Sequence, residues 1–167
     1  APADYNGSEG FAITVTDGSL EDLQTITVTV NAVNDAPVAT TDLSGSTNED
    51  QSVVIILSGT DIDGDLLSYS LVTDANNGNV LISGPVATYS PSVNFYGIDS
   101  FIFSVSDGYL SDEASVTLTV NAVNDAPFIN EVFAQEVNED ELFQLEIIAS
   151  DNDNDDLFYD VSISNNN

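Results

Sequence analysis

Apolar and polar residues alternate with a period of two along most of this chain. Between residues 53 and 120 the alternating apolar positions are Val53/Ile55/Leu57, Leu67/Tyr69/Leu71, Val80/Ile82, Phe101/Phe103/Val105 and Val116/Leu118/Val120. Period two with one apolar face is typical of a strand that buries one side against a second sheet. Two further strands are predicted near Val38–Ser44 and Val86–Ser90, and no stretch supports a long amphipathic helix.

Turn-forming pairs separate these segments. They are Asp63-Gly64, Asn77-Gly78, Gly84-Pro85 and Asp107-Gly108. Seven short strands divided by such turns, within about 90 residues, are typical of a Greek-key β-sandwich. We therefore predict an all-β fold of immunoglobulin-like architecture.

The landmarks of this pattern recur 90 residues apart. The heptapeptide Asn-Ala-Val-Asn-Asp-Ala-Pro occupies residues 31–37 and again 121–127. A fixed period of domain size indicates a tandem array. We predict the last third of one repeat over residues 1–35, a complete repeat over 36–125, and the first half of a third over 126–167.

Neither partial repeat can bury a complete core alone, because a sandwich needs both of its sheets. We expect the chain to be cropped from a longer array. The alternative is that its two ends dock between subunits, head to tail, and complete each other's sandwich.

Charge restricts the partners of this chain. It has no Lys, Arg or His against 29 Asp and Glu, which gives a formal net charge of −29. The chain therefore cannot neutralise phosphates, and nucleic acid and anionic membrane surfaces are excluded as partners. Self-repulsion of this size calls for external counterions, and an all-oxygen ligand set selects a hard cation, calcium first.

The remaining composition excludes several protein classes. Hydrophobic residues make up 42 % of the chain in regular alternation, so disorder is excluded despite the charge. There is no Cys for a disulfide scaffold, and no apolar run approaches the ~20 residues of a membrane span. No His, Cys or Lys exists to act as base or nucleophile, so we expect no enzymatic activity. An extracellular, exported setting is expected.

Three motifs carry a family resemblance that spans the whole chain. They are the Val-Asn-Asp-Ala-Pro linker, the Asp-x-Asp-Gly-Asp loop at 61–65, and a Ser/Thr-Asp-Gly turn after a Phe-x-Phe/Ile-x-Val strand. Together they resemble the cadherin-type domain, and more closely the cadherin-like repeats of large bacterial surface adhesins and secreted proteins. The resemblance implies calcium ions between consecutive domains, held by one domain's lower end, the linker, and the next domain's upper end.

Matching residue by residue, the resemblance implies a ligand set for each of two joints. The first joint would use Asn34, Asp35, Asp61, Asp63 and Asp107, and the second Glu49, Asn124, Asp125, Asp151 and Asp153. Asp17 and Glu139 match the turn aspartate and the first-strand glutamate in the two partial repeats.

The chain also departs from the cadherin pattern. The linker is one residue shorter, and its leading acid is replaced by Ala32 or Ala122, unless Asn31 or Asn121 takes that place. The paired acids before the penultimate strand are missing, with Asn94, Asp99 and Asp4 as weak substitutes. One or two ions per joint are therefore expected rather than three.

Turn formation alone also explains single Asp-Gly pairs, because Asp favours turns through side-chain to backbone bonds. It does not explain Asp at both 61 and 63, or an acidic linker on so negative a chain. Residues 61–72 do not fit an EF-hand loop, because such a loop requires Glu at its twelfth position and Val72 occupies it here.

The expected function is a calcium-stiffened extension segment of a cell-surface adhesin or filament, whose partners are neighbouring repeats of the same protein. Carbohydrate binding is an alternative and would use exposed aromatic residues. Its candidates are Phe95, Tyr96, Tyr109 and Phe158. A filament subunit that binds other copies of itself through its partial repeats is the third possibility.

Overall fold

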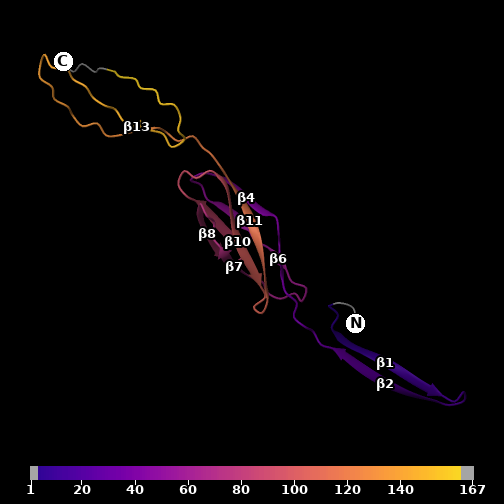
Figure 1. The fold of residues 1–167 in the computed structure, drawn as a ribbon. Helices are drawn as coiled ribbons and strands as arrows, with labels where there is room; N and C mark the ends of the chain where they lie inside the picture. Colours follow the sequence, from indigo (N-terminus) through magenta and orange to yellow (C-terminus); the bar gives the residue numbers. More distant parts are fainter. Residues whose placement is uncertain (1–3, 163–167) are drawn as a thin grey trace.

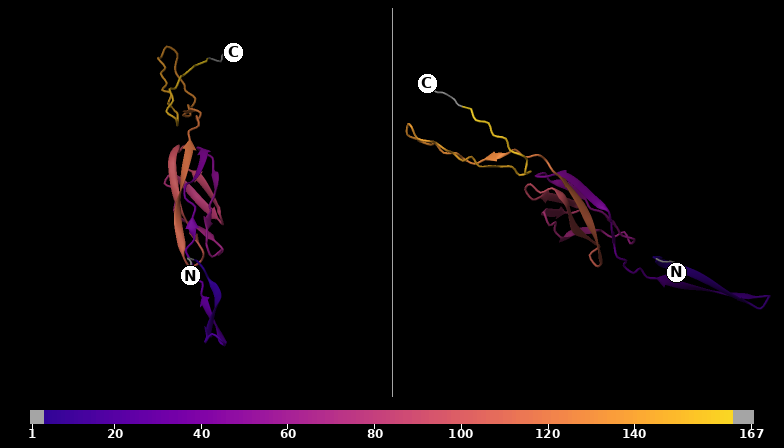
Figure 2. Two further views of the ribbon diagram at one scale, coloured as in Figure 1. Left: turned by 90° about the vertical axis from the view of Figure 1, so that its right-hand side faces the viewer. Right: turned by 45° about the horizontal axis from the view of Figure 1, so that its top comes forward.

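The computed structural model describes residues 4–162, so the outermost residues of both predicted partial repeats, 1–3 and 163–167, lie outside the described part. All regular secondary structure from 4 to 162 is β-strand, which confirms the all-β prediction. Those residues accordingly include no helix long and apolar enough to cross a bilayer. A hairpin, a sandwich and a C-terminal segment follow one another along the long axis of the molecule (Figures 1 and 2).

The N-terminal hairpin consists of β1 (Gly7–Thr16) and β2 (Glu21–Val30). The two strands pair antiparallel along their whole length, from Gly7 opposite Val30 to Thr16 opposite Glu21. β1 and β2 lie 90 residues before the last two strands of the middle unit and match them in position.

The middle unit contains nine strand segments. They are β3 (Val38–Ala39), β4 (Leu43–Asn48), β5 (Val53–Ile56), β6 (Gly59–Thr60), β7 (Ser68–Thr73), β8 (Gly78–Ser83), β9 (Val86–Pro91), β10 (Gly97–Ser106) and β11 (Ser111–Asn121). One sheet has the order β4-β11-β10-β7 and the other β5-β9-β8, while β3 pairs with β6. Only β4 and β11 run parallel among these pairs.

The predicted first strand over 38–44 is divided in the structure. β3 pairs antiparallel with β6, and β4 then pairs parallel with β11 in the other sheet. Between them Asp42 has φ 60°, a left-handed conformation that interrupts an extended strand. Period two alone cannot show this division, because β3 and β4 both keep one side toward the core.

The core of the middle unit lies between its two sheets. The largest fully buried side chains include Leu57, Tyr89, Phe101, Phe103, Val105, Val116 and Leu118. These are alternate positions of the strands, as predicted, because successive side chains point to opposite faces of a sheet. The immunoglobulin-like sandwich expected from the sequence is therefore present in this unit.

The C-terminal segment from 126 to 162 contains only β12 (Phe128–Ile129) and β13 (Ala149–Ser150), paired antiparallel. By position, residues 133–138 and 158–162 correspond to β4 and β7. In the middle unit those strands hydrogen-bond to β11 and β10, and the C-terminal segment has no equivalent of either among its described residues. The described C-terminal segment therefore forms few of the strand pairs found in the middle unit.

Candidate cation sites at the two joints

At the first joint, the linker is hydrogen-bonded to acidic residues of the middle unit. The side-chain amide of Asn34 donates to Oδ2 of Asp107 (2.8 Å). The backbone N–H of Asp35 donates to Oδ2 of Asp63 (2.8 Å). The structure thus brings together the linker and upper-end residues of the predicted first set.

The acidic loop after β6 holds a cluster of three carboxylates. Asp61, Asp63 and Asp65 each offer one carboxylate oxygen, and these oxygens lie within 4.8 Å of one another. Oδ1 of Asp61 accepts the backbone N–H groups of Asp63 (2.9 Å) and Asp65 (3.2 Å). Gly64 has φ 80°, which a side chain would strain, and it lets the loop turn back on itself.

The second carboxylate oxygen of Asp61, Oδ2, is buried and has no hydrogen-bond partner in the described part of the chain. A buried unpartnered oxygen of a charged group is costly, and the sequence has no side-chain cation to compensate it. A hard metal ion that accepts oxygen ligands fits this position. Asp65 was absent from the predicted ligands, although the Asp-x-Asp-Gly-Asp motif contains it.

Asp4 adds a carboxylate from the N-terminal side of the joint. It lines one hollow with Asp35 and Asp63, and an adjacent one with Asp35 and Asp61. Its φ of 61° matches the 56° of Asn94, its equivalent 90 residues later. The first joint therefore combines acids from the N-terminal unit, the linker and the middle unit.

The turn aspartate Asp107 both stabilises its own turn and contacts the linker. Oδ1 of Asp107 accepts the backbone N–H groups of Tyr109 (2.6 Å) and Leu110 (2.7 Å), while its Oδ2 faces Asn34. The Asn34 hydrogen bond, followed by those from Leu110 and Tyr109, lowers the pKa of Asp107. Backbone N–H groups of Leu20 and Ser19 likewise lower the pKa of Asp17. Turn formation and a ligand role are therefore compatible in one carboxylate.

The second joint repeats the linker contacts of the first. The backbone N–H of Asp125 donates to Oδ2 of Asp153 (2.6 Å), and that of Asp153 to Oδ1 of Asp151 (2.9 Å). The side chain of Asn124 donates to the carbonyl of Asp125 (2.9 Å), as Asn34 does to Asp35. No counterpart of Asp107 lies against Asn124 in the described residues.

Glu49 lies at the second joint, as predicted for the far end of its strand. It is only 4 % exposed, and its carboxylate accepts the backbone N–H of Val123. Its own N–H donates to the carbonyl of Asn121 (2.9 Å). Glu49 thus fixes the start of the second linker against the middle unit.

Other predicted residues lie away from the two joints. Asp17 is in the turn between β1 and β2, at the far end of the hairpin, and Glu139 is in a turn of the C-terminal segment. Asp99 is 5 % exposed and accepts hydrogen bonds from the backbone of Asn76 and Asn77 and from the Tyr89 hydroxyl. The structure therefore gives Asp99 a role inside the sandwich.

Two of the exposed aromatic candidates for carbohydrate binding, Tyr96 and Tyr109, lie at opposite ends of one strand. Phe95 packs against the core, whereas Tyr96, Tyr109 and Phe158 are exposed. Tyr96 precedes β10 and Tyr109 follows it, so the length of this strand, roughly 30 Å at 3.3 Å per residue, separates them. Phe158 belongs to the C-terminal segment.

A comparison with known families agrees with an immunoglobulin-like fold. The family described as "Bacterial Ig domain" matches residues 34–119, about half of the chain. A comparison with curated proteins gave no match.

Three solved structures are similar to part of this chain. The endo-fucoidan hydrolase MfFcnA4 from glycoside hydrolase family 107 is 19 % identical, with a TM-score of 0.43 over 73 % of this chain and 20 % of that one. Drosophila N-cadherin EC1-4 is 14 % identical, with a TM-score of 0.47 over 73 % and 35 %. Titin domains z1z2 in complex with telethonin are 13 % identical, with a TM-score of 0.38 over 70 % and 62 %. This chain thus spans about a fifth of the hydrolase and about a third of the cadherin fragment.

Proposed function

This chain belongs to the bacterial Ig domain family, and from that premise we propose that it is a calcium-stiffened segment of an extracellular repeat array. Ca²⁺ binds at the two joints between consecutive units. The three units comprise residues 1–35, 36–125 and 126–167. The segment extends a cell-surface adhesin or filament and is not catalytic.

The observation that carries this proposal is the environment of the Asp61 carboxylate. One of its carboxylate oxygens is buried without a partner, beside oxygens of Asp63 and Asp65. Ca²⁺ takes six to eight oxygen ligands, and carboxylates supply the charge while carbonyls and water complete the shell. Asp4 and Asp35 line the adjoining hollows and supply further oxygens.

Stiffening follows from where these acids come from. Like charges on the two sides of a joint repel each other, and no Lys, Arg or His of the chain offsets this repulsion. A cation between them reverses the sign of the interaction and ties the linker to both units. Extracellular calcium modules bind at ~10⁻⁴–10⁻³ M, so such sites fill outside a cell and empty inside it.

Calorimetric titration with Ca²⁺ tests the proposal. We expect binding in the range of ~10⁻⁴–10⁻³ M, and we expect Asp61→Asn to weaken the first-joint site about tenfold or more, since it removes charge at the unpartnered oxygen. Glu21→Gln is the matched control, because Glu21 pairs with Thr16 at the far end of the hairpin. Absence of binding, or equal binding by the Asp61 variant, contradicts the proposal.

A further inference from the structure

The outer face of the β5-β9-β8 sheet carries apolar side chains that point to solvent. Val54 and Ile56 of β5 and Leu81 of β8 are 59 %, 61 % and 68 % exposed. The strand pairing places Thr88 of the central strand β9 between Val54 and Leu81, and it places Val86 beside Ile56. These five residues therefore form one continuous patch, which we call the apolar flank.

The fold itself does not require apolar residues at these positions. Ninety residues later, Val54 and Ile56 correspond to Gln144 and Glu146. The outer face of the other sheet is also mostly polar, and its strand β11 exposes Ser115, Thr117 and Thr119 between buried apolar residues. Single exposed apolar residues are common, whereas a continuous apolar patch is typical of an interaction surface. The apolar flank therefore indicates a contact that the complete middle unit makes with a partner.

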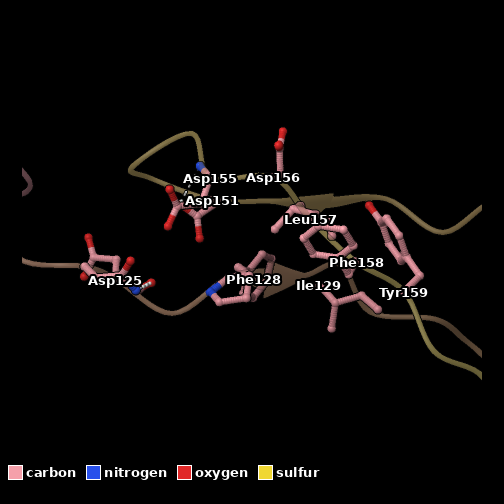
Figure 3. Close-up of a pocket in the computed structure, with 12 residues that line it drawn as sticks. Asp125, Phe128, Ile129, Asp151, Asp155, Asp156, Leu157, Phe158 and Tyr159 are labelled. Carbon is pink, nitrogen blue, oxygen red and sulfur yellow. Dashed lines mark hydrogen bonds between the residues drawn. The ribbon is translucent and has the colours of Figure 1, made fainter.

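The strands of this sheet contain no acidic residue. Asp and Glu account for 29 of the 167 residues, yet none occurs in 51–60 or 75–98, the two stretches that contain β5, β8 and β9. Apolar side chains at the second joint, in contrast, lie among acids. The hollow of about 460 Å³ there is lined by Phe128 and Leu157 together with Asp125, Asp151 and Asp155 (Figure 3).

We propose that the apolar flank is a contact surface between two copies of this chain, with the flank of one copy packed on the flank of the other. Each copy has a net charge of −29, so two copies repel wherever their acidic surfaces meet. The flank lets them bury apolar area without bringing carboxylates together. A cationic partner would gain nothing from the lack of acids, whereas a partner as acidic as this chain requires it. A second copy meets that condition and, across a two-fold axis, presents the matching apolar surface.

The size of the flank limits the strength of this contact. Three strands spaced ~4.8 Å apart, with six residues of ~3.3 Å each, cover roughly 300 Å² per copy. The contact thus buries roughly 600 Å² in total, which is less than the ~1,200 Å² of stable complexes. We expect a dissociation constant of ~10⁻⁴–10⁻³ M. Added NaCl should strengthen the contact, because it screens the repulsion between the acidic copies.

A contact of this strength acts between arrays that lie side by side. Arrays held on one surface keep their units at a high local concentration, which compensates for weak affinity. This setting rests on the proposed function, whereas the contact between two flanks does not. It also leaves the ends of the middle unit, where the acidic joints lie, free for the neighbouring units.

Sedimentation equilibrium in high salt with EDTA, up to about 2 mM protein, tests the contact. The original chain should shift reversibly from 17.7 kDa toward twice that mass. Ile56→Glu introduces the residue type found at position 146 and should weaken association about tenfold or more, because the contact would bury an unpaired charge. Ile98→Glu is the matched control. Ile98 is 67 % exposed on the outer face of the other sheet, so this variant should associate like the original chain.

A single introduced thiol locates the contact, because the chain contains no cysteine. Thr88→Cys places the thiol in the middle of the apolar flank, and Ser100→Cys places it on the outer face of the other sheet. Maleimide modification of Thr88→Cys should slow about twofold or more between dilute and concentrated protein, since most copies are then paired. Modification of Ser100→Cys should keep the same rate, and Ile56→Glu added to Thr88→Cys should remove the protection.

Three results would each overturn the proposal. The first is an original chain that stays monomeric at every concentration. The second is equal association of the Ile56→Glu and Ile98→Glu variants. The third is a modification rate of Thr88→Cys that does not depend on protein concentration. Because calcium is absent throughout, these results decide the contact and leave the proposed calcium sites to their own titration.

Discussion

The backbone N–H of Asp35 donates a hydrogen bond of 2.8 Å to Oδ2 of Asp63, 28 residues further along the chain. The same bond joins Asp125 to Asp153 at the second joint, at 2.6 Å. Each linker is thus tied to the acidic loop of the unit that follows it. This repeated contact places linker and loop oxygens together, and it is the geometry from which cation binding at both joints is inferred.

Replacement of Asp63 by Asn tests the contribution of charge at this contact while keeping its hydrogen bond. Asparagine keeps an oxygen that accepts the N–H of Asp35 but removes one negative charge from the cluster with Asp61 and Asp65. Calcium at about 100 times its dissociation constant should stabilise the original chain by about 2.7 kcal/mol per site. Thermal melting with and without calcium measures this stabilisation. In Asp63→Asn, most of the part contributed by calcium at the first joint should be lost. An undiminished calcium effect would count against the site.

Glu49 should stabilise the second joint through its contact with the linker. Glu49→Ala leaves the N–H of Val123 without its carboxylate partner, and a lost partner of this kind costs about 1–3 kcal/mol. Glu49→Gln retains an acceptor and should cost less. Urea unfolding measures both, and equal stability of the alanine variant and the original chain would show that Glu49 does not fix the linker.

Gly78 is a position where the core tolerates no side chain. A Cβ there would overlap the ring of Tyr89 and lie 2.6 Å from the carbonyl oxygen of Ser90. Gly78→Ala should therefore destabilise the middle unit by about 1–3 kcal/mol, the usual cost of overpacking. Gly10→Ala is the matched control, because its Cβ would meet only Cγ2 of Thr25 at 3.8 Å. Equal unfolding midpoints for the two variants would contradict the packing described.

The buried pair of Tyr89 and Asp99 should make the middle unit sensitive to alkaline pH. Burial raises the pKa of Tyr89, and the hydrogen bond to Asp99 and the charge of Asp99 raise it further. The unfolded tyrosine loses its proton near its ordinary pKa of about 10, while the folded one keeps it. Above that pH the unfolded state binds fewer protons, so stability falls as pH rises.

Urea midpoints measured at several pH values between about 9 and 11 test this sign. Tyr89→Phe should flatten the fall, because phenylalanine has no proton to lose. Tyr109→Phe is the control, since Tyr109 is 87 % exposed. A fall that is equally steep in Tyr89→Phe and in the original chain would contradict the pairing.

Much of this fold was predictable because side-chain direction in a strand has a strict period. Phe101, Phe103 and Val105 alternate with polar neighbours and are buried as predicted. The same reasoning explains Asp99, which is in phase with Phe101 and therefore points inward, although its residue type had indicated a joint ligand. Phase was the better guide at this position because a carboxylate can be buried when N–H and O–H groups satisfy it.

Other features required three-dimensional information. The division between β3 and β4 depends on the left-handed backbone of Asp42, which residue type alone does not fix. Asp65 joins the cluster only because the loop folds back at Gly64. Asp4 was only a weak substitute from the family resemblance, and the structure places it along one hollow with Asp61.

The central claim is that Ca²⁺ bound at the two joints stiffens the array. Small-angle scattering of the chain with saturating calcium and with EDTA, combined with a calcium titration of the two joints, tests it most directly. If cations tie the units together, calcium should lengthen the maximum dimension and narrow the distribution of shapes, and Asp61→Asn should show a smaller change. Identical scattering curves in calcium and in EDTA would contradict the account.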